Sequence, residues 1–368
     1  MSSPKPLAGL SKIAPYVAGE SEIEGQEKVI KLASNEGAFG PSPKTLEAIK
    51  KSAEDYHRYP DGDSRKIRQI LADRHGLEFD QIICGCGSDE LIMLLCRSYA
   101  GPGDEILFSA HGFAMYPIYG LTVGADIVSA PETDITVDVD NMLAAVTDKT
   151  RLVFVANPNN PTGTYLPASD LRRLHAGLRD DILFVIDGAY AEYVDQPDYS
   201  DGLDLVRENE NVVALRTFSK IYGMGGIRLG WGYFAPEVAD IINRMRSPFN
   251  VSYPAQAAGV AALNDQDFVK KSQKHNKEWL AWTTKQIRAL GLTVPDSYGN
   301  FVVVRFPTEE TPGQNSKKDA KAADAFLKAN GIIVRRLGGY GLPDALRISI
   351  GLEEEMRDVV AYLAEFME

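Results

Sequence analysis

The sequence predicts an α/β protein built on a mainly parallel, helix-covered β-sheet, followed by a smaller α+β domain. Short and nearly continuous apolar runs recur between residues 81 and 219, and helical patterns fit between them. Strands that crossover helices bury on both faces have this uninterrupted apolar character. After about Asn250 the pattern changes to a long helix and three further strands. A chain of 368 residues is long enough for one large domain or two.

Six apolar runs predict strands of the large sheet. In chain order they are "QIICGCG" (81–87), "DEILFSA" (104–110), "ADIVSA" (125–130), "TRLVFVANP" (150–158), "DILFVIDGAY" (181–190) and "NVVALRTFS" (211–219). Helices are expected between them, for example over Asp89–Tyr99 and Ala168–Arg179. This alternation is typical of parallel strands that are joined by helical crossovers.

The C-terminal part of the chain predicts a separate, smaller α+β domain. Its elements are a helix over Asp265–Leu290, strands in "NFVVVRF" (300–306) and "GIIVRRL" (331–337), a helix over Lys318–Asn330 between them, a strand in "ALRISIG" (345–351) and a C-terminal helix. The polar stretch "TEETPGQNSKKD" is expected to be a surface loop. The predicted division is an N-terminal arm (1–30), a large domain (31–250) and a small domain (251–368).

Charge and composition exclude several classes of function. The formal charge is 39 − 51 = −12 and there is no run of lysines and arginines, so nucleic acid and anionic membranes are poor candidate partners. The apolar stretches are shorter than the ~20 residues of a transmembrane helix. The N-terminal "MSSPKPLAGLSKIAPY" has no apolar signal-peptide core. We therefore expect a soluble cytoplasmic protein.

The three cysteines, Cys84, Cys86 and Cys96, cannot all form disulfides with one another. They indicate a reducing compartment. The Cys-Gly-Cys spacing is too tight for the usual zinc knuckle, so no metal site is expected.

Polar and reactive residues follow four of the predicted strands. They are Ser88–Glu90 after the first strand, "NPNNPTG" (157–163) after the fourth, Asp187 and Tyr190 after the fifth, and Lys220 after the sixth. In open parallel sheets, ligands bind at the carboxyl ends of the strands. These residues therefore predict a site at that edge of the sheet.

Each of these features also has a plain structural interpretation. Ser88 and Asp89 could cap the helix that follows them, and Asp187 could be another cap. Tyr190 could belong to the core, and "NPNNPTG" alone is a tight turn. A dinucleotide fingerprint is incomplete in "GCGSDE" and in "GMGGIRLG", which argues against a nicotinamide dehydrogenase. The five histidines form no triad pattern, so acyl transfer has little support.

Taken together, the four strand ends suit pyridoxal phosphate. This cofactor needs a lysine amine for its Schiff base, a carboxylate for its pyridine nitrogen and hydrogen-bond donors for its phenolate oxygen. Its phosphate suits a helix N-terminus that follows glycines, as in "GCGSDE". The segment "RTFSKIYGMGGIRLGW" (216–231) adds hydroxyls, a lysine and an arginine in one place.

The motifs also resemble a known family. "NNPTG", "D-x-x-Y" and "S-K-x-x-G-x-x-G-x-R-x-G", in this order, are similar to those of the fold-type I aminotransferases. "IAPYVAG", "ASNE…GPSP", "HRYPD", "GCGSDE", "HGFAMYP" and "YGLPDALRISIG" resemble the histidinol-phosphate aminotransferase family more narrowly. The resemblance runs from about Ile13 to the end of the chain. It implies a seven-stranded, mainly parallel large-domain sheet and a homodimer.

The resemblance implies roles around the cofactor ring. Lys220 would form the Schiff base and then act as the base that moves the substrate's proton. Asp187 would pair with the pyridine nitrogen. Asn160 and Tyr190 would hydrogen-bond the phenolate oxygen, and Phe113 would stack on the ring.

The resemblance also implies how the cofactor phosphate and the substrate are held. The cofactor phosphate would be bound by Ser88, Asp89, Thr217, Ser219 and Arg228, and by Tyr59 of the neighbouring subunit. Arg335 and Arg347 would face the substrate, with Tyr16 and Asn35 closing over it. Strand alternation lets only one of Arg335 and Arg336 face the site, and the family motif favours Arg335.

The implied reaction transfers an amino group between histidinol phosphate and 2-oxoglutarate, giving imidazole acetol phosphate and glutamate in histidine biosynthesis. Two departures from the family pattern bear on the substrate: "NENP" is Glu36-Gly37-Ala38-Phe39 here, and the stacking residue, often tyrosine, is phenylalanine. An aromatic amino-acid aminotransferase of the same fold is the main alternative. A β-lyase or decarboxylase of this fold, or a non-catalytic relative, are the others.

Overall fold

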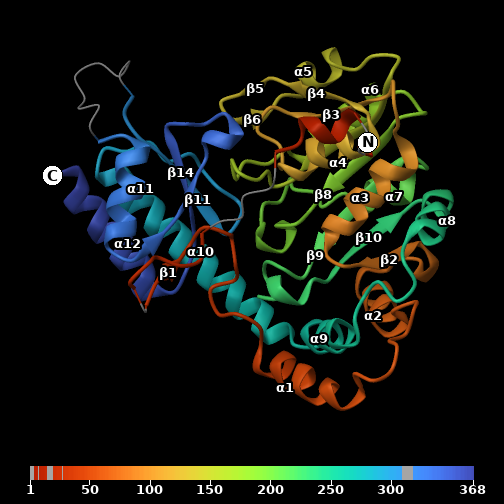
Figure 1. The fold of residues 1–368 in the computed structure, drawn as a ribbon, viewed down its shortest axis with the longest axis horizontal. Helices are drawn as coiled ribbons and strands as arrows, with labels where there is room; N and C mark the ends of the chain where they lie inside the picture. The colour runs from red at the N-terminus through yellow and green to blue at the C-terminus, as the bar shows by residue number, and fades with distance from the viewer. Residues whose placement is uncertain (1–3, 7, 15–19, 27, 309–317) are drawn as a thin grey trace.

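The computed structural model describes residues 4–6, 8–14, 20–26, 28–308 and 318–368 (Figure 1). Its helices are α1 (Pro43–Ser52), α2 (Arg65–His75), α3 (Ser88–Tyr99), α4 (Met115–Val123), α5 (Val139–Ala144), α6 (Ala168–Gly177), α7 (Leu203–Glu208), α8 (Pro236–Met245), α9 (Tyr253–Leu263), α10 (Gln266–Ala289), α11 (Ala320–Ala329) and α12 (Glu353–Met367). Its strands are β1 (Ile30–Lys31), β2 (Ile82–Gly85), β3 (Glu105–Ser109), β4 (Asp126–Ala130), β5 (Glu132–Thr133), β6 (Thr136–Val137), β7 (Thr150–Ala156), β8 (Leu183–Asp187), β9 (Val212–Thr217), β10 (Gly230–Phe234), β11 (Phe301–Arg305), β12 (Ile332–Ile333), β13 (Arg335–Arg336) and β14 (Ala345–Ser349).

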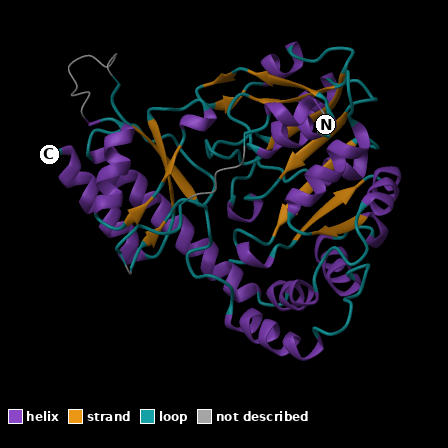
Figure 2. Cartoon of the chain, in the orientation of Figure 1, coloured by secondary structure: helices purple, strands orange, loops and turns teal. Residues whose placement is uncertain are grey.

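A seven-stranded sheet forms the larger part of the molecule, with strand order β2-β10-β9-β8-β7-β3-β4 (Figures 1 and 2). The five strands from β9 to β4 are parallel to one another, and β10 is antiparallel to both of its neighbours. The predicted α/β fold with a mainly parallel sheet is confirmed. The six apolar runs each contain a strand of this sheet, whereas the sequence interpretation did not assign β10.

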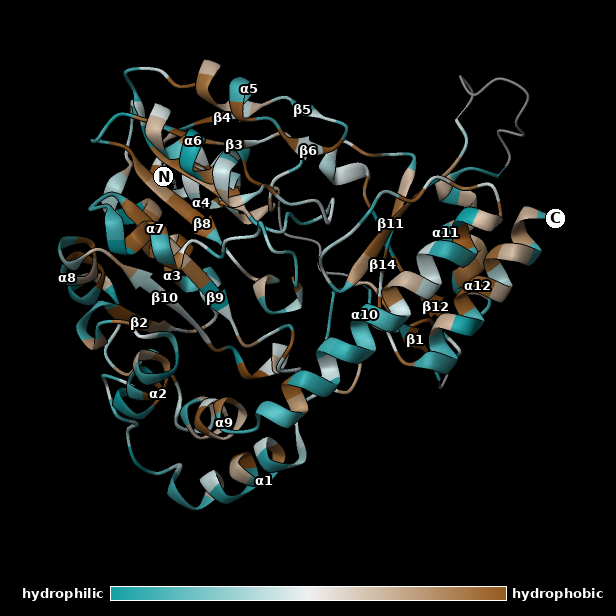
Figure 3. Cartoon of the chain, turned by 180° about the vertical axis from the view of Figure 1, so that it is seen from behind, coloured by the Kyte–Doolittle hydropathy of each residue, from teal (hydrophilic) through white to brown (hydrophobic). Residues whose placement is uncertain are grey.

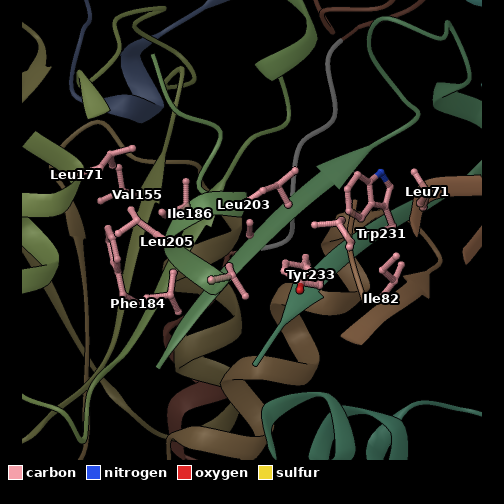
Figure 4. Close-up of a cluster of buried hydrophobic side chains, with 14 of the residues drawn as sticks. Leu71, Ile82, Val155, Leu171, Phe184, Ile186, Leu203, Leu205, Trp231 and Tyr233 are labelled. Atoms are coloured by element: carbon pink, nitrogen blue, oxygen red, sulfur yellow. The ribbon is translucent and has the colours of Figure 1, made fainter. Parts of the chain in front are cut away.

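The strands bury side chains on both faces, as parallel strands with crossover helices do. Along β8, Phe184 and Ile186 belong to one apolar cluster and Leu183 and Val185 to the other. Helices α2, α6, α7 and α9 contribute to the first cluster, part of which is shown in Figure 4, and α3, α4 and α8 to the second. Figure 3 shows the molecule from behind, coloured by hydropathy. The buried strand β8 is hydrophobic along its length, whereas the exposed turns of α10 are hydrophilic.

Local sequence signals set several helix ends. The Ser42 hydroxyl accepts a hydrogen bond from the Thr45 amide, 3.2 Å away, at the start of α1. The Asp319 carboxylate caps α11 in the same way through the Ala322 amide at 2.7 Å. Gly76 ends α2 in the left-handed conformation that glycine adopts most easily.

The C-terminal part of the chain has its own antiparallel sheet, β11-β14-β13, covered by helices α10, α11 and α12. The expectation of one strand in "GIIVRRL" was wrong. Ile332–Ile333 pair in parallel with Ile30–Lys31, while Arg335–Arg336 pair with β14. The chain passes from one sheet to the other between Ile333 and Arg335, so this short run forms two strands, one paired with β1 and one with β14.

The domain limits at residues 30 and 250 stay a prediction. Two segments connect the proposed units across those limits. The short strand β1 and Leu32 pack with the C-terminal apolar cluster, although most of the chain that follows belongs to the large sheet. The buried residues of α9 pack into a cluster of the large sheet. Within the described residues, no helix is long and apolar enough to cross a membrane.

Candidate active site

A cavity of about 460 Å³ lies at the carboxyl edge of the large sheet. The polar residues that follow β2, β7, β8 and β9 converge on it, as the sequence predicted. The predicted site residues that line it are Ser88, Asp89, Phe113, Asn160, Asp187, Tyr190, Thr217, Ser219, Lys220 and Arg228. Ser34 and Glu36, from the segment that follows β1, complete part of its wall.

One end of the cavity is built to receive an anion. Helix α3 begins there, with Gly87 as the residue before its first turn and no side-chain cap. A Cβ atom on Gly87 would stand 2.5 Å from Nη2 of Arg228, so the absence of a side chain lets the guanidinium lie against the helix N-terminus. Free amides and a cation at a helix start attract phosphate. Because Gly87 stands at the N-cap position and no side chain caps α3, the alternative that Ser88 or Asp89 caps this helix is wrong.

Hydroxyl groups extend this anion-binding end. The Thr217 hydroxyl donates to Ser219 Oγ at 3.0 Å, and the Ser219 amide donates to Thr217 Oγ1 at 3.1 Å. The Asp89 carboxylate accepts a hydrogen bond of 2.9 Å from the Tyr119 hydroxyl, and burial raises the pKa of this carboxyl. It is the backbone amides of Ser88 and Asp89, and not this carboxylate, that suit an anion.

A buried carboxylate stands at the end of β8. Asp187 accepts hydrogen bonds from the Tyr116 hydroxyl at 2.9 Å and from the Ala189 amide at 3.2 Å. Burial raises the pKa of Asp187 to about 6, although these two hydrogen bonds and the Lys220 charge act in the opposite direction. A carboxylate that is desolvated in this way gains most from a cationic partner such as a protonated pyridine.

Sequence reasoning missed Tyr116 and Tyr119. Tyr116 is fully buried and stacks on Phe154, with ring centroids 4.7 Å apart. It lies three residues after Phe113 in "HGFAMYP": Phe113 precedes α4, and Tyr116 stands in the first turn of that helix. The sequence pattern gave no sign that this tyrosine would contact Asp187.

Lys220 is a half-buried amine with few compensating charges. Its Nζ donates to the Ser34 carbonyl oxygen at 3.3 Å and lies 5.6 Å from the centroid of the Tyr190 ring. Burial and the positive charges of Arg347 and Arg228 lower the pKa of Lys220 to about 8. An amine with this pKa is partly neutral near pH 7.5, and the neutral form is the nucleophile and the base.

Arg347, on β14, contacts one of the residues that line the cavity. Its guanidinium is buried and donates to Asn160 Oδ1 at 2.5 Å and to the Ala33 carbonyl oxygen at 2.8 Å. In the register of the small sheet, Arg335 stands directly opposite Arg347. Directly opposed residues of an antiparallel pair share a face, so Arg335 lies on the face of Arg347. Arg336 is exposed and pairs with Leu346.

Among the described residues, four predicted site residues do not line the cavity: Arg347, Arg335, Asn35 and Tyr59. Asn35 is buried beside the cavity, where its side chain donates to the Tyr190 hydroxyl at 2.9 Å. Its backbone is held by the C-terminal unit through Ser349 Oγ at 2.8 Å and the Asn300 side chain at 3.1 Å. Tyr59 is 81% exposed and does not line the cavity. Tyr16 lies outside the described residues.

The residues present fit pyridoxal phosphate. Gly87 leaves room for Arg228 at the helix N-terminus, and the hydroxyls of Thr217 and Ser219, the Asp187 carboxylate and the Lys220 amine belong to residues that line the same cavity. These are an anion site, a carboxylate and a partly neutral amine, and the cofactor offers a phosphate, a basic ring nitrogen and an aldehyde.

Comparison with known proteins supports the same chemistry. Residues 27–363 match the family model described as aminotransferase class I and II. The chain is 55% identical to a histidinol-phosphate aminotransferase of Paramagnetospirillum magneticum, over 100% of this chain and 99% of that protein. It is 53% identical to a protein of the same name from Rhodospirillum rubrum, over 99% and 97% of the two chains.

Solved structures show the same fold. A Sinorhizobium meliloti histidinol-phosphate aminotransferase in complex with pyridoxal-5'-phosphate superimposes with a TM-score of 0.89 at 29% identity, covering 100% of this chain and 98% of that chain. A Thermus thermophilus aspartate aminotransferase with maleate has a TM-score of 0.80 at 22% identity, covering 92% of each chain, and shows the fold alone.

Proposed function

Because this chain belongs to the family of class I and II aminotransferases, we propose that it is a histidinol-phosphate aminotransferase. The reaction moves an amino group between histidinol phosphate and 2-oxoglutarate, in histidine biosynthesis. The observation that carries this choice is the full-length similarity to bacterial enzymes of that name. The cofactor is pyridoxal 5'-phosphate, which supplies a protonated ring that accepts the electron pair released when the substrate's α-proton leaves.

The chain's own residues perform the proton transfers and the positioning. Lys220 removes the α-proton of the substrate, and its lowered pKa, about 8, supplies the neutral amine that this step requires. Asp187 holds the proton on the ring nitrogen through its buried carboxylate. Asn160 and Tyr190 bind the phenolate oxygen, and Phe113 stacks on the ring. One site serves both substrates in turn, so the kinetics are ping-pong.

The phosphate and carboxylate groups are held by charge at the two ends of the cavity. Arg228 binds the cofactor phosphate together with the hydroxyls of Thr217 and Ser219 and the first amides of α3. Arg347 binds a carboxylate of glutamate, and Arg335, on the same face of the small sheet, adds the second positive charge that the phosphate of histidinol phosphate needs. An arginine fork binds either anion through paired charge-assisted hydrogen bonds.

The proposed enzyme is a homodimer with shared sites. Tyr59 lies in a turn away from its own cavity, and its side chain is exposed at the surface. We assign it to the cofactor phosphate of the partner subunit. A cytoplasmic location fits the three cysteines, which are all unpaired.

The substrate assignment is tested with paired arginine variants. Arg335→Ala should raise KM for histidinol phosphate at least about tenfold and affect glutamate less, because a charge-assisted hydrogen bond contributes about 1.5–3 kcal/mol. Arg336→Ala, an exposed residue on the opposite side of the same strand, is the matched control and should leave both KM values unchanged. Steady-state kinetics with both amino donors measure the difference.

Equal and small effects of the two variants would remove Arg335 from the substrate site. If the wild-type enzyme turned over phenylalanine or tyrosine far better than histidinol phosphate, the aromatic aminotransferase alternative would replace the present assignment.

A further inference from the structure

Phe249 has a backbone conformation that its own packing does not explain. Its φ is 57°, in the left-handed region that a bulky aromatic residue rarely adopts. Its side chain is 42% exposed, so burial of the ring offers little compensation for that strain. Strained residues of this kind persist where their position serves another part of the molecule.

The Phe249 ring supports the Tyr59 ring. The two rings are stacked, with centroids 4.6 Å apart and planes inclined by 18°. The Phe249 ring also lies over Gly62, where an added Cβ would be 3.6 Å from it. Tyr59 is 81% exposed, so an aromatic surface on one side restricts a side chain that otherwise faces solvent.

Two residues close to Phe249 in the sequence, Arg246 and Gln256, fix the backbone of the turn that carries Tyr59. Arg246 donates to the Gly62 carbonyl oxygen at 2.6 Å and forms an ion pair of 3.1 Å with Asp63. Gln256 donates to the Asp61 carbonyl oxygen at 2.7 Å. These contacts hold the backbone of the turn. The Tyr59 side chain could still rotate, and its stacking on Phe249 restricts that rotation.

We propose that Phe249 is a positioning residue, whose strained backbone presents the ring that directs Tyr59 toward the cofactor phosphate of a second copy of this chain. The inference rests on the proposed homodimer, in which Tyr59 completes the partner's site. Phe249 does not line the cavity of its own chain, and it acts through Tyr59.

The experiment measures the dissociation constant of pyridoxal phosphate by equilibrium dialysis of the full-length enzyme. Phe249→Gly removes the ring while placing at this φ the residue that tolerates it best, so the fold should not suffer. Asp134→Gly is the matched control, because Asp134 is exposed, has a φ of 48° and lies in the hairpin between β5 and β6. Tyr59→Phe keeps the stacked ring and removes only the hydroxyl.

Phe249→Gly should weaken cofactor binding by roughly the same factor as Tyr59→Phe, about tenfold, which is the loss of one hydrogen bond to a charged group. The double variant should be no weaker than either single variant, because both remove one interaction. Phe249→Tyr should bind as the wild type does, and Asp134→Gly likewise. Unfolding temperature and dimer content should be unchanged in Phe249→Gly.

Other patterns overturn the proposal in distinguishable ways. If Tyr59→Phe weakens binding and Phe249→Gly does not, Phe249 has no positioning role, while the proposed role of Tyr59 stands. If Tyr59→Phe binds normally, the shared site itself is wrong, and the inference fails with it. Additive effects of the two substitutions on cofactor binding would show that Phe249 does not act through Tyr59. A Phe249→Gly protein that sediments as a monomer would show that Phe249 is needed for dimer assembly instead.

Discussion

Asp187 shows how a site residue can oppose the stability of the protein that carries it. Its pKa is raised by burial to about 6, from 3.8 for an exposed aspartate. Between these values the folded protein binds a proton that the unfolded chain has released, so stability falls as the pH rises from about 4 to about 6. Above pH 6 the cofactor-free protein carries a constant deficit of about 3 kcal/mol.

We therefore expect Asp187→Asn to stabilise the cofactor-free protein at pH 7.5 by about 2–3 kcal/mol and to have little effect at pH 4. The amide keeps the shape of the side chain and cannot ionise. Urea unfolding at the two pH values measures the effect, with Asp358→Asn on the exposed side of α12 as the control. A stabilisation that was equal at both pH values would show that ionisation is not its cause.

Single residues also show what sequence can and cannot predict. Asp187 and Lys220 were predictable as site residues because each follows a strand of a parallel sheet, and strand ends gather at one edge. Tyr116 was not, because the partner of a helical hydroxyl depends on how the helix turns over the sheet. Tyr119 and its hydrogen bond to Asp89 were hidden for the same reason.

At the scale of elements, β10 determines how closely the anion-binding helix can approach the sheet. A Cβ atom on Gly230 would stand 2.1 Å from the Ser88 amide nitrogen, so this strand runs directly against the first turn of α3. Backbone atoms cannot move aside as a flexible side chain can. The strand must therefore start with glycine for the helix N-terminus to occupy its position.

We expect Gly230→Ala to destabilise the protein by about 2–3 kcal/mol and to weaken cofactor binding, because overpacking against backbone forces α3 to shift. Gly226→Ala, in the short turn before β10, is the matched control, since nothing lies within 4 Å of its added Cβ atom. Urea unfolding and dialysis against pyridoxal phosphate report the two effects. Equal behaviour of the two variants would contradict the steric explanation.

The sequence predicted the helices and strands that a continuous local pattern specifies. It missed the strands that depend on pairing with neighbouring strands. The long helix α10 and the six apolar strands follow from continuous local patterns. Strand β10, "GWGYF", has two glycines in five residues and is recognisable as a strand only between its neighbours β2 and β9. The division of "GIIVRRL" into β12 and β13 likewise depends on the positions of β1 and β14.

At the scale of the whole molecule, the proposed shared sites can be tested by mixing two kinds of impaired subunit at limiting cofactor. In a hybrid of Lys220→Ala and Tyr59→Phe subunits, one site would carry both substitutions and the other neither. Random mixing should restore about a quarter of wild-type activity at limiting cofactor, because half of the dimers are hybrids with one intact site.

If Tyr59 served its own subunit, every hybrid site would carry one substitution and mixing would restore nothing. A protein that sediments as a monomer would also contradict the shared site. The sequence alone could suggest this arrangement only by resemblance, because a single chain contains no pattern that marks which of its residues serve a second copy.

The segment that follows β1 joins the two halves of the molecule at the reactive amine. Asn35 is hydrogen-bonded to Ser349 and Asn300 of the C-terminal unit, while the carbonyl oxygen of its neighbour Ser34 accepts from Lys220. Asn35 also donates to Tyr190. A rotation of the C-terminal unit would therefore displace the Ser34 carbonyl oxygen that accepts from Lys220 and the Asn35 amide that donates to Tyr190. The same rotation would carry Arg347, which we assign to the substrate and which donates to the Ala33 carbonyl oxygen in this segment.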